Sequence, residues 1–138
     1  MRRDELRAAA SFFAERSSSR VGGVWHEVVV HLVRDGQSAE CHRAIMGIDG
    51  VTDVITQAYD AIPPEPEGLF GELFVNVDQA LRAAPVRRGW SPARELLLYV
   101  AHGMDHFSGA DDHGVAGYLA MRRRELRWLK QWNRLERT

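Results

Sequence analysis

Hydrophobic and polar residues follow two different periods along this chain. Apolar residues that recur every three or four positions predict amphipathic helices, which cover residues 4–16, 38–46, 78–84, 91–107 and 115–135. Alternating or valine-rich apolar runs predict strands, which cover residues 21–33, 51–56 and 69–77. Serines at 17–19 and Gly47 end the first two helices, and three prolines make residues 62–68 a loop. The pattern predicts an α+β fold in one domain, residues 1–138, with three to four strands packed against about five helices.

Three elements carry expectations about burial. Residues 21–33 are apolar on both faces, which suits a strand in the middle of a sheet. The helix over 91–107 starts at Ser91-Pro92, because serine caps a first turn and proline is tolerated there. It is almost wholly apolar over 96–101, so we expect it to be the buried central helix. The last helix has an expected apolar side of Leu119, Leu126 and Leu129, with Met121, Trp128, Trp132 and Leu135 beside them.

The composition is that of an ordinary soluble globular protein. Of 138 residues, 45% are hydrophobic and 27% are charged, which argues against a disordered or collagen-like chain. No apolar stretch approaches the ~18 residues of a membrane span. Cys41 is the only cysteine, so an intrachain disulfide and a cysteine-rich zinc site are excluded. Asp4 and Glu5 precede any apolar run, which does not fit a secretory signal, and we expect a cytoplasmic location.

The net charge of -1 conceals an uneven distribution. Residues 44–81 contain seven acidic residues and no Lys or Arg, whereas residues 122–137 contain seven basic residues and two acidic ones. Such a run of charge is compatible with a solvated helix face. It is also compatible with a basic surface for nucleic acid, since arginine matches phosphate geometry. Charge alone does not decide between these interpretations.

Three of the six histidines lie close together in HGMDHFSGADDH. His102 and His106 are four residues apart on one helix, so both imidazoles leave the same face. Gly109 lets the chain reverse, and His113 can then return to that face. Three protein nitrogens with one open position form the usual arrangement of catalytic zinc. The alternative is that these are ordinary exposed or buried histidines, since a lone His-x-x-x-His pair is weak evidence.

Three ordered motifs carry a family resemblance. His102, Gly103, His106, Gly109 and Asp111 match the motif H-G-x-L-H-L-x-G-Y-D-H. The segment GIDGVTDVI resembles G-x-D-x-P-T-D-V-L-S-F, and the segment GELFV resembles G-D-I-x-I. On these motifs, which span most of residues 38–126, the chain resembles the YbeY family of bacterial rRNA maturation factors.

The resemblance implies a mixed sheet, a three-histidine metal site and endoribonuclease activity on single-stranded RNA. It implies a role in maturing the 3′ end of small-subunit rRNA and in ribosome quality control. We therefore expect one Zn²⁺ ion per chain, held by His102, His106 and His113 at the end of the central helix. The expected partners are single-stranded rRNA and the ribosome or its small subunit, with no membrane and no DNA.

The chain departs from the family motifs at two important positions. The family's third histidine lies ten residues after the first, where this chain has Asp112, and His113 follows one residue later. Either residue is an acceptable zinc ligand. The family also has an arginine before its G-x-D-x-P-T-D-V segment, where this chain has Met46. Methionine cannot neutralise a phosphate, and Arg43, one helical turn earlier, is the candidate catalytic residue in its place.

Three functions remain open on the sequence. The first is a zinc-dependent endoribonuclease in which Thr52 and Asp53 shape the cleft or form only a strand-entry turn. RNA affinity would come from basic residues elsewhere, namely Arg87, Arg88, Arg122, Arg123 and Arg124. The second is a noncatalytic ribosome assembly or RNA-binding factor that keeps the metal site, which Met46 favours. The third is a zinc hydrolase for another substrate, which is opposed by Gly103 where a zinc peptidase has its glutamate base.

Overall fold

The structure is a computed structural model, and it describes residues 1–21, 25–60, 69–87, 89–110 and 113–136. The described helices are α1 (Arg3–Val21), α2 (Asp35–Met46), α3 (Val77–Ala83), α4 (Pro92–Phe107) and α5 (Gly114–Glu136). The strands are β1 (Trp25–Val33), β2 (Val54–Asp60) and β3 (Leu69–Asn76). The predicted α+β class is confirmed, while the expected loop at 62–68 lies outside the described residues. None of the described helices is long and apolar enough to cross a membrane.

The sheet is small and mixed, with the strand order β1-β3-β2. β3 pairs in parallel with β1 on one edge and antiparallel with β2 on the other. The prediction that the valine-rich strand lies in the middle of the sheet is therefore wrong, because β1 is an edge strand. An apolar run on both faces reports what covers those faces, and it carries no information about which strands pair along the two edges.

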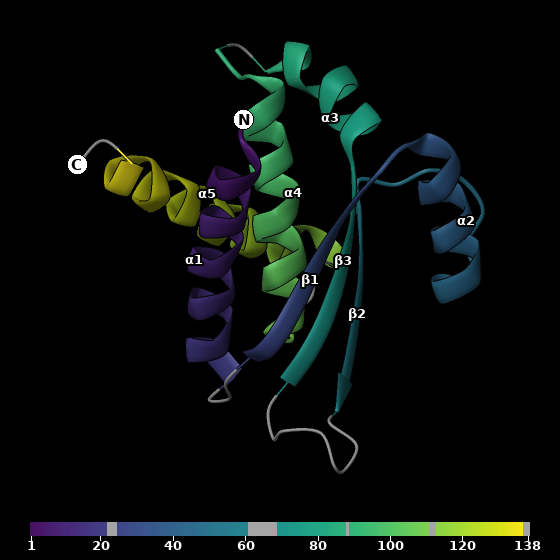
Figure 1. The fold of residues 1–138 in the computed structure, drawn as a ribbon, viewed down its shortest axis with the longest axis horizontal. Helices are drawn as coiled ribbons and strands as arrows, with labels where there is room; N and C mark the ends of the chain where they lie inside the picture. Colours follow the sequence, from purple (N-terminus) through teal and green to yellow (C-terminus); the bar gives the residue numbers. More distant parts are fainter. Residues whose placement is uncertain (22–24, 61–68, 88, 111–112, 137–138) are drawn as a thin grey trace.

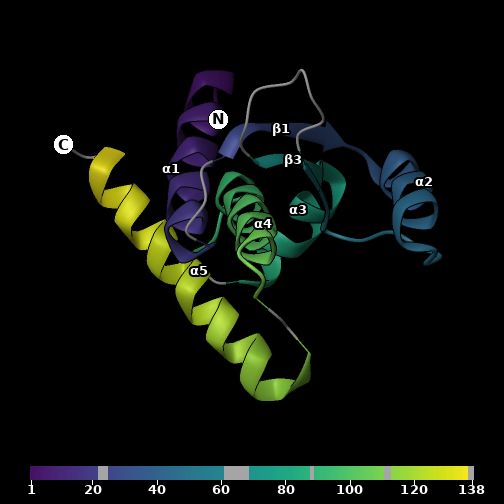
Figure 2. The same ribbon diagram turned by 90° about the horizontal axis from the view of Figure 1, so that it is seen from below.

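Helix α4 is the buried centre of the fold, as predicted. Ser91 caps it through a hydrogen bond from the Arg94 N–H to Ser91 Oγ of 3.1 Å, and Pro92 occupies the first turn. Figure 2 shows α4 between the sheet and α5, with α1 and α3 at its sides. In Figure 1, α2 lies on the right of the strands, whereas α1, α4 and α5 lie on the left. Helix α4 contacts the other helices α1, α3 and α5 and the strands β2 and β3.

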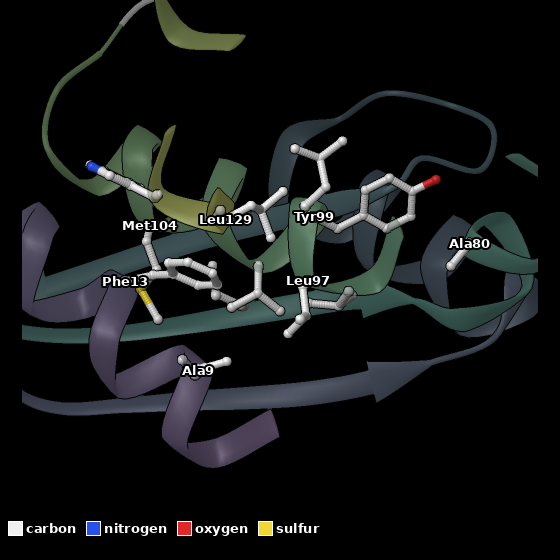
Figure 3. Packing of buried hydrophobic residues seen from close by; sticks show 14 residues of the cluster. Ala9, Phe13, Ala80, Leu97, Tyr99, Met104 and Leu129 are labelled. Atoms are coloured by element: carbon white, nitrogen blue, oxygen red, sulfur yellow. The ribbon is translucent and has the colours of Figure 1, made fainter. Parts of the chain in front are cut away.

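Side chains from three helices and the sheet meet around α4 (Figure 3). Phe13 of α1 and Leu129 of α5 are fully buried there, next to Met104 of α4. Gly103 faces the sheet so closely that a Cβ on it would lie 2.5 Å from Leu73 Cδ2. The residue after His102 must therefore be a glycine for α4 to approach β3, and this position has no room for the glutamate of a zinc peptidase.

Two helices differ from their predicted form. Helix α1 runs through the serines to Val21, and the Ser18 and Ser19 hydroxyls donate to the Glu15 carbonyl, so that their hydrogen bonds are made inside the helix. On α5, Leu119 and Leu126 are 42% and 38% exposed, so the predicted apolar side is only partly right. The buried positions of α5 are Met121, Glu125, Trp128 and Leu129. A prediction of the buried face from hydrophobicity alone leaves out Glu125, whose carboxylate is buried on that face.

Candidate metal centre

Two histidines of α4 converge as their spacing predicts. His102 and His106 lie on successive turns, and their Nε2 atoms are 3.1 Å apart. The ring centroids are 4.5 Å apart with nearly perpendicular planes. His102 is only 8% exposed, and His106 is half-buried. Each ring therefore presents the same nitrogen to one point at the edge of the core.

A carboxylate on α5 contacts the ring nitrogen of His102 that does not face His106. Glu125 is fully buried, and its Oε2 lies 2.8 Å from His102 Nδ1. An ionised carboxylate only accepts, so Nδ1 donates its proton and the neutral ring keeps its lone pair on Nε2. This fixes the ring's tautomer and its orientation. A carboxylate behind the imidazole is the usual support of a metal-binding histidine.

Sequence reasoning missed Glu125, although the sequence contains a signal for it. Residues 121, 125, 128, 129 and 132 recur at helical spacing, and Glu125 is the charged member of that otherwise apolar set. A lone acid on an apolar helix face needs a buried partner. The structure supplies one in His102.

The electrostatics of the pair follow from its burial. Burial of the His102 ring opposes protonation, but the hydrogen bond and the charge of Glu125 outweigh it, so the pKa of His102 is raised. Burial raises the pKa of Glu125 as well, against the opposing influence of His102 and Arg122. Both groups therefore hold a proton more readily than in water.

The donor set fits a zinc ion. Two imidazole nitrogens at ~2.0–2.1 Å from one tetrahedral zinc ion would lie about 3.3–3.4 Å apart, close to the 3.1 Å found between the two Nε2 atoms. Two neutral lone pairs repel at that distance, so a proton or a cation must lie between them. His102 and His106 are therefore placed to act as two nitrogen ligands, and metal binding by them stays a prediction.

The third ligand remains a prediction. His113 is exposed and directly precedes α5. Asp111 and Asp112 lie outside the described residues. Over the residues that the structure describes, no three His, Cys, Asp or Glu side chains already form a metal-binding group. The choice between Asp112 and His113 therefore stays as the sequence left it.

A second buried ion pair joins the same two helices. Arg124 Nε donates to Asp105 Oδ1 at 2.8 Å, and Asp105 is fully buried on α4. Asp105 stands where the family motif has a leucine. Its pairing with Arg124 gives that departure a structural role, because it fixes α5 against α4 at the residue directly before His106.

Arg43 lies in a different environment from the histidine pair. It belongs to α2, its side chain is 76% exposed, and its Nε donates to Asp49 Oδ1 at 3.0 Å. Met46, on the same helix, is 54% exposed. The structure does not bring Arg43 together with His102 or His106 in any contact of the described residues, so its catalytic role stays a prediction.

Thr52 and Asp53 form the entry into β2. The backbone N–H of Val54 donates to Asp53 Oδ1 at 2.7 Å, and the Ser38 hydroxyl donates to the Thr52 carbonyl. Both residues also line a hollow of about 400 Å³ together with Tyr99, which lies one turn before His102. The two interpretations of this segment, a turn and a cleft wall, are therefore compatible.

The basic residues proposed for RNA affinity fall into separate groups. Arg87 pairs with Glu95 at 3.1 Å, and Arg124 is held by Asp105. Arg123 is exposed, Arg122 is mostly buried, and Arg88 lies outside the described residues. A wider groove of about 1200 Å³ runs along β1 between α1 and α2, and neither His102 nor His106 lines it.

Comparison with known proteins gives a consistent result. A family model described as endoribonuclease YbeY matches residues 3–133. The endoribonuclease YbeY of Rhodopirellula baltica is 36% identical over 104 residues, which cover 75% of this chain and 52% of the relative. Those of Moorella thermoacetica and Chloroflexus aggregans are 35% and 33% identical, over 72% of this chain and 68% and 69% of their own lengths. The chain thus spans about half the length of the first relative and about two thirds of the other two.

Proposed function

Since the chain belongs to the YbeY endoribonuclease family, we propose that it is a zinc-dependent endoribonuclease that hydrolyses single-stranded RNA. The proposed substrate is rRNA near the 3′ end of the small subunit, in ribosome maturation and quality control, and the proposed location is the cytoplasm. One zinc ion per chain would be held by His102, His106 and His113.

One observation carries the proposal. The Nε2 atoms of His102 and His106 meet at 3.1 Å while Glu125 holds the opposite side of the His102 ring. This arrangement supports the proposal because a cation can take the place of the proton between the two Nε2 atoms without a change in the position of either ring. When bound there, zinc supplies Lewis-acid stabilisation of negative charge and makes a water molecule more acidic.

The chain's own residues do the positioning. Glu125 keeps the His102 ring in one tautomer, and the approach of α4 to β3 at Gly103 fixes the depth of that ring in the fold. The Arg124–Asp105 pair fixes α5, which carries Glu125, against α4. A preorganised site of this kind loses little free energy to rearrangement during the reaction.

Two alternatives are weighed against this proposal. Met46 in place of the family arginine favours a noncatalytic assembly factor that binds RNA and keeps its metal. A zinc hydrolase that cleaves peptides is disfavoured, because Gly103 leaves no space for a general base after His102.

Incubation of the purified chain with single-stranded rRNA fragments, with and without a chelator, separates these functions. We expect the wild-type chain to cleave the RNA and a chelator to stop the cleavage. The variants His102→Ala and His106→Ala should lose both the cleavage activity and the bound zinc. RNA binding without cleavage by the zinc-loaded chain would support the assembly factor instead. A wild-type chain that binds no metal would exclude both zinc-dependent functions.

A further inference from the structure

A buried arginine stands beside the histidine pair. Arg122 precedes Glu125 by one turn of α5, and its side chain is only 19% exposed. Its Nε and Nη1 atoms are both buried, and neither has a hydrogen-bond partner in the described parts of the chain. Its contacts are longer ones: Nη1 lies 3.8 Å from Glu125 Oε1, and Cζ lies 5.6 Å from the centre of the Tyr118 ring.

Such an arrangement is costly unless something completes it. A guanidinium removed from water loses the hydrogen bonds of its N–H groups, and a buried charged donor without an acceptor is strongly unfavourable. The neighbouring Arg124 avoids this cost by donating to Asp105. The Nε and Nη1 atoms of Arg122 have no acceptor within hydrogen-bond distance among the described residues, so an acceptor has to come from the space that Arg122 lines.

That space is the hollow of about 400 Å³ that Arg122 lines. Its volume lies within the range of small-ligand pockets. It reaches from Tyr99, one turn before His102 on α4, to Asp53 at the start of β2. Neither His102 nor His106 is among the described lining residues, and the hollow meets α4 at Tyr99 and α5 at Arg122.

The charges around the hollow single out Arg122 as its anion-binding group. Arg87 also lines it, but Arg87 Nε lies 3.1 Å from Glu95 Oε2 and compensates that buried carboxylate. Asp53 opposes an anion, although its Oδ1 already accepts from the Val54 N–H at 2.7 Å. Arg122 thus brings to the hollow a positive charge whose Nε and Nη1 atoms have no hydrogen-bonded acceptor among the described residues.

We propose that the guanidinium of Arg122 binds a backbone phosphate of the RNA strand in this hollow. A guanidinium and a phosphate form charge-assisted hydrogen bonds, which are stronger than hydrogen bonds between neutral groups. The assignment rests on the proposed function and deepens it. It also differs from the Arg43 hypothesis, because Arg43 is exposed and already pairs with Asp49.

Binding measurements on the zinc-loaded chain test this subsite. The variants are Arg122→Ala, Arg122→Lys and, as a matched control, Arg127→Ala, which removes an exposed arginine of the same helix. We expect Arg122→Ala to raise the Kd for a labelled single-stranded RNA oligonucleotide about tenfold or more. We also expect its slope of log affinity against log salt to fall by about one. Arg122→Lys should recover part of the affinity, because lysine keeps the positive charge but lacks the planar guanidinium.

Zinc content separates a direct role from a structural one. If Arg122 acts only by supporting Glu125, zinc content and RNA affinity should fall in parallel in both Arg122 variants, and that result would overturn the proposal. Equal Kd values for Arg122→Ala and Arg127→Ala would overturn it as well.

A second readout does not need RNA. Inorganic phosphate titrated into the wild-type chain should shift the NMR resonance of the Arg122 Nε–H, and an unchanged resonance would contradict the subsite. If the wild type neither binds nor cleaves RNA, the proposed function fails. The phosphate titration then still decides whether Arg122 binds an oxyanion.

Discussion

The replacement Glu125→Gln tests whether the buried carboxylate prepares His102 for a metal. Glutamine has nearly the shape of glutamate, and its carbonyl oxygen can still accept from His102 Nδ1, where Glu125 Oε2 now lies at 2.8 Å. The variant therefore keeps the hydrogen bond and removes the charge. Because Glu125 is fully buried, water does not screen that charge, and its loss should have a large effect on His102.

The size of the effect follows from this geometry. Loss of a carboxylate behind a metal-binding histidine typically lowers metal affinity by about 10–100-fold, which corresponds to about 1.4–2.7 kcal/mol. We also expect the pKa of His102 in the metal-free chain to fall, because Glu125 is what raises it against the effect of burial. Burial and Arg122, which both lower the pKa of His102, are then opposed by Asp53 and no longer by the charge of Glu125.

Two assays measure these effects. Competition with a chromogenic chelator gives the zinc affinity, and NMR of the His102 ring protons against pH gives its pKa. Glu136→Gln is the matched control, since it removes an exposed carboxylate at the end of the same helix. If Glu125→Gln binds zinc as tightly as the wild type and leaves the pKa of His102 unchanged, the supporting role of Glu125 is refuted.

Two further predictions concern the fold that carries the site. Gly103→Ala should destabilise the chain by about 1–3 kcal/mol in urea unfolding, because its Cβ would lie 2.5 Å from Leu73 Cδ2. The control Gly36→Ala should not lower the free energy of unfolding, because nothing lies within 4 Å of the added Cβ. Equal effects of the two substitutions would contradict the close approach of α4 to the sheet. The hydrogen bonds of Arg82 lower the pKa of Asp35 from 3.8 to about 2, so the stability from this pair is present above pH 3.8 and is lost as the pH falls through 2. Acid titration of Asp35→Asn should therefore show a smaller loss of stability between pH 4 and 2 than the wild type, and an equal loss would exclude this pair as a cause.

The sequence predicted the elements better than their arrangement. Ser91-Pro92 and the apolar run after it identify α4 and its burial, because capping and helix periodicity are local properties. The position of β1 at an edge depends on which strands pair, and this is decided by contacts far apart in the sequence. The valine-rich segment therefore looked central and is not.

The candidate site shows the same division. The spacing of His102 and His106 predicts that they share a face, and their Nε2 atoms do meet. Glu125 and Arg122 lie on another helix, and their relation to the histidines depends on how α5 crosses α4. Hydrophobicity gave only part of the buried face of α5, because that face includes a charged residue whose partner belongs to α4.

The family membership and the site chemistry together make a specific claim about the metal. A crystal of the chain with zinc, measured at the zinc absorption edge, tests that claim most directly. We predict one anomalous peak at ~2.0–2.1 Å from both His102 Nε2 and His106 Nε2, with either His113 or Asp112 as the third protein ligand. Zinc bound elsewhere, or no peak between the two imidazoles, would contradict the account.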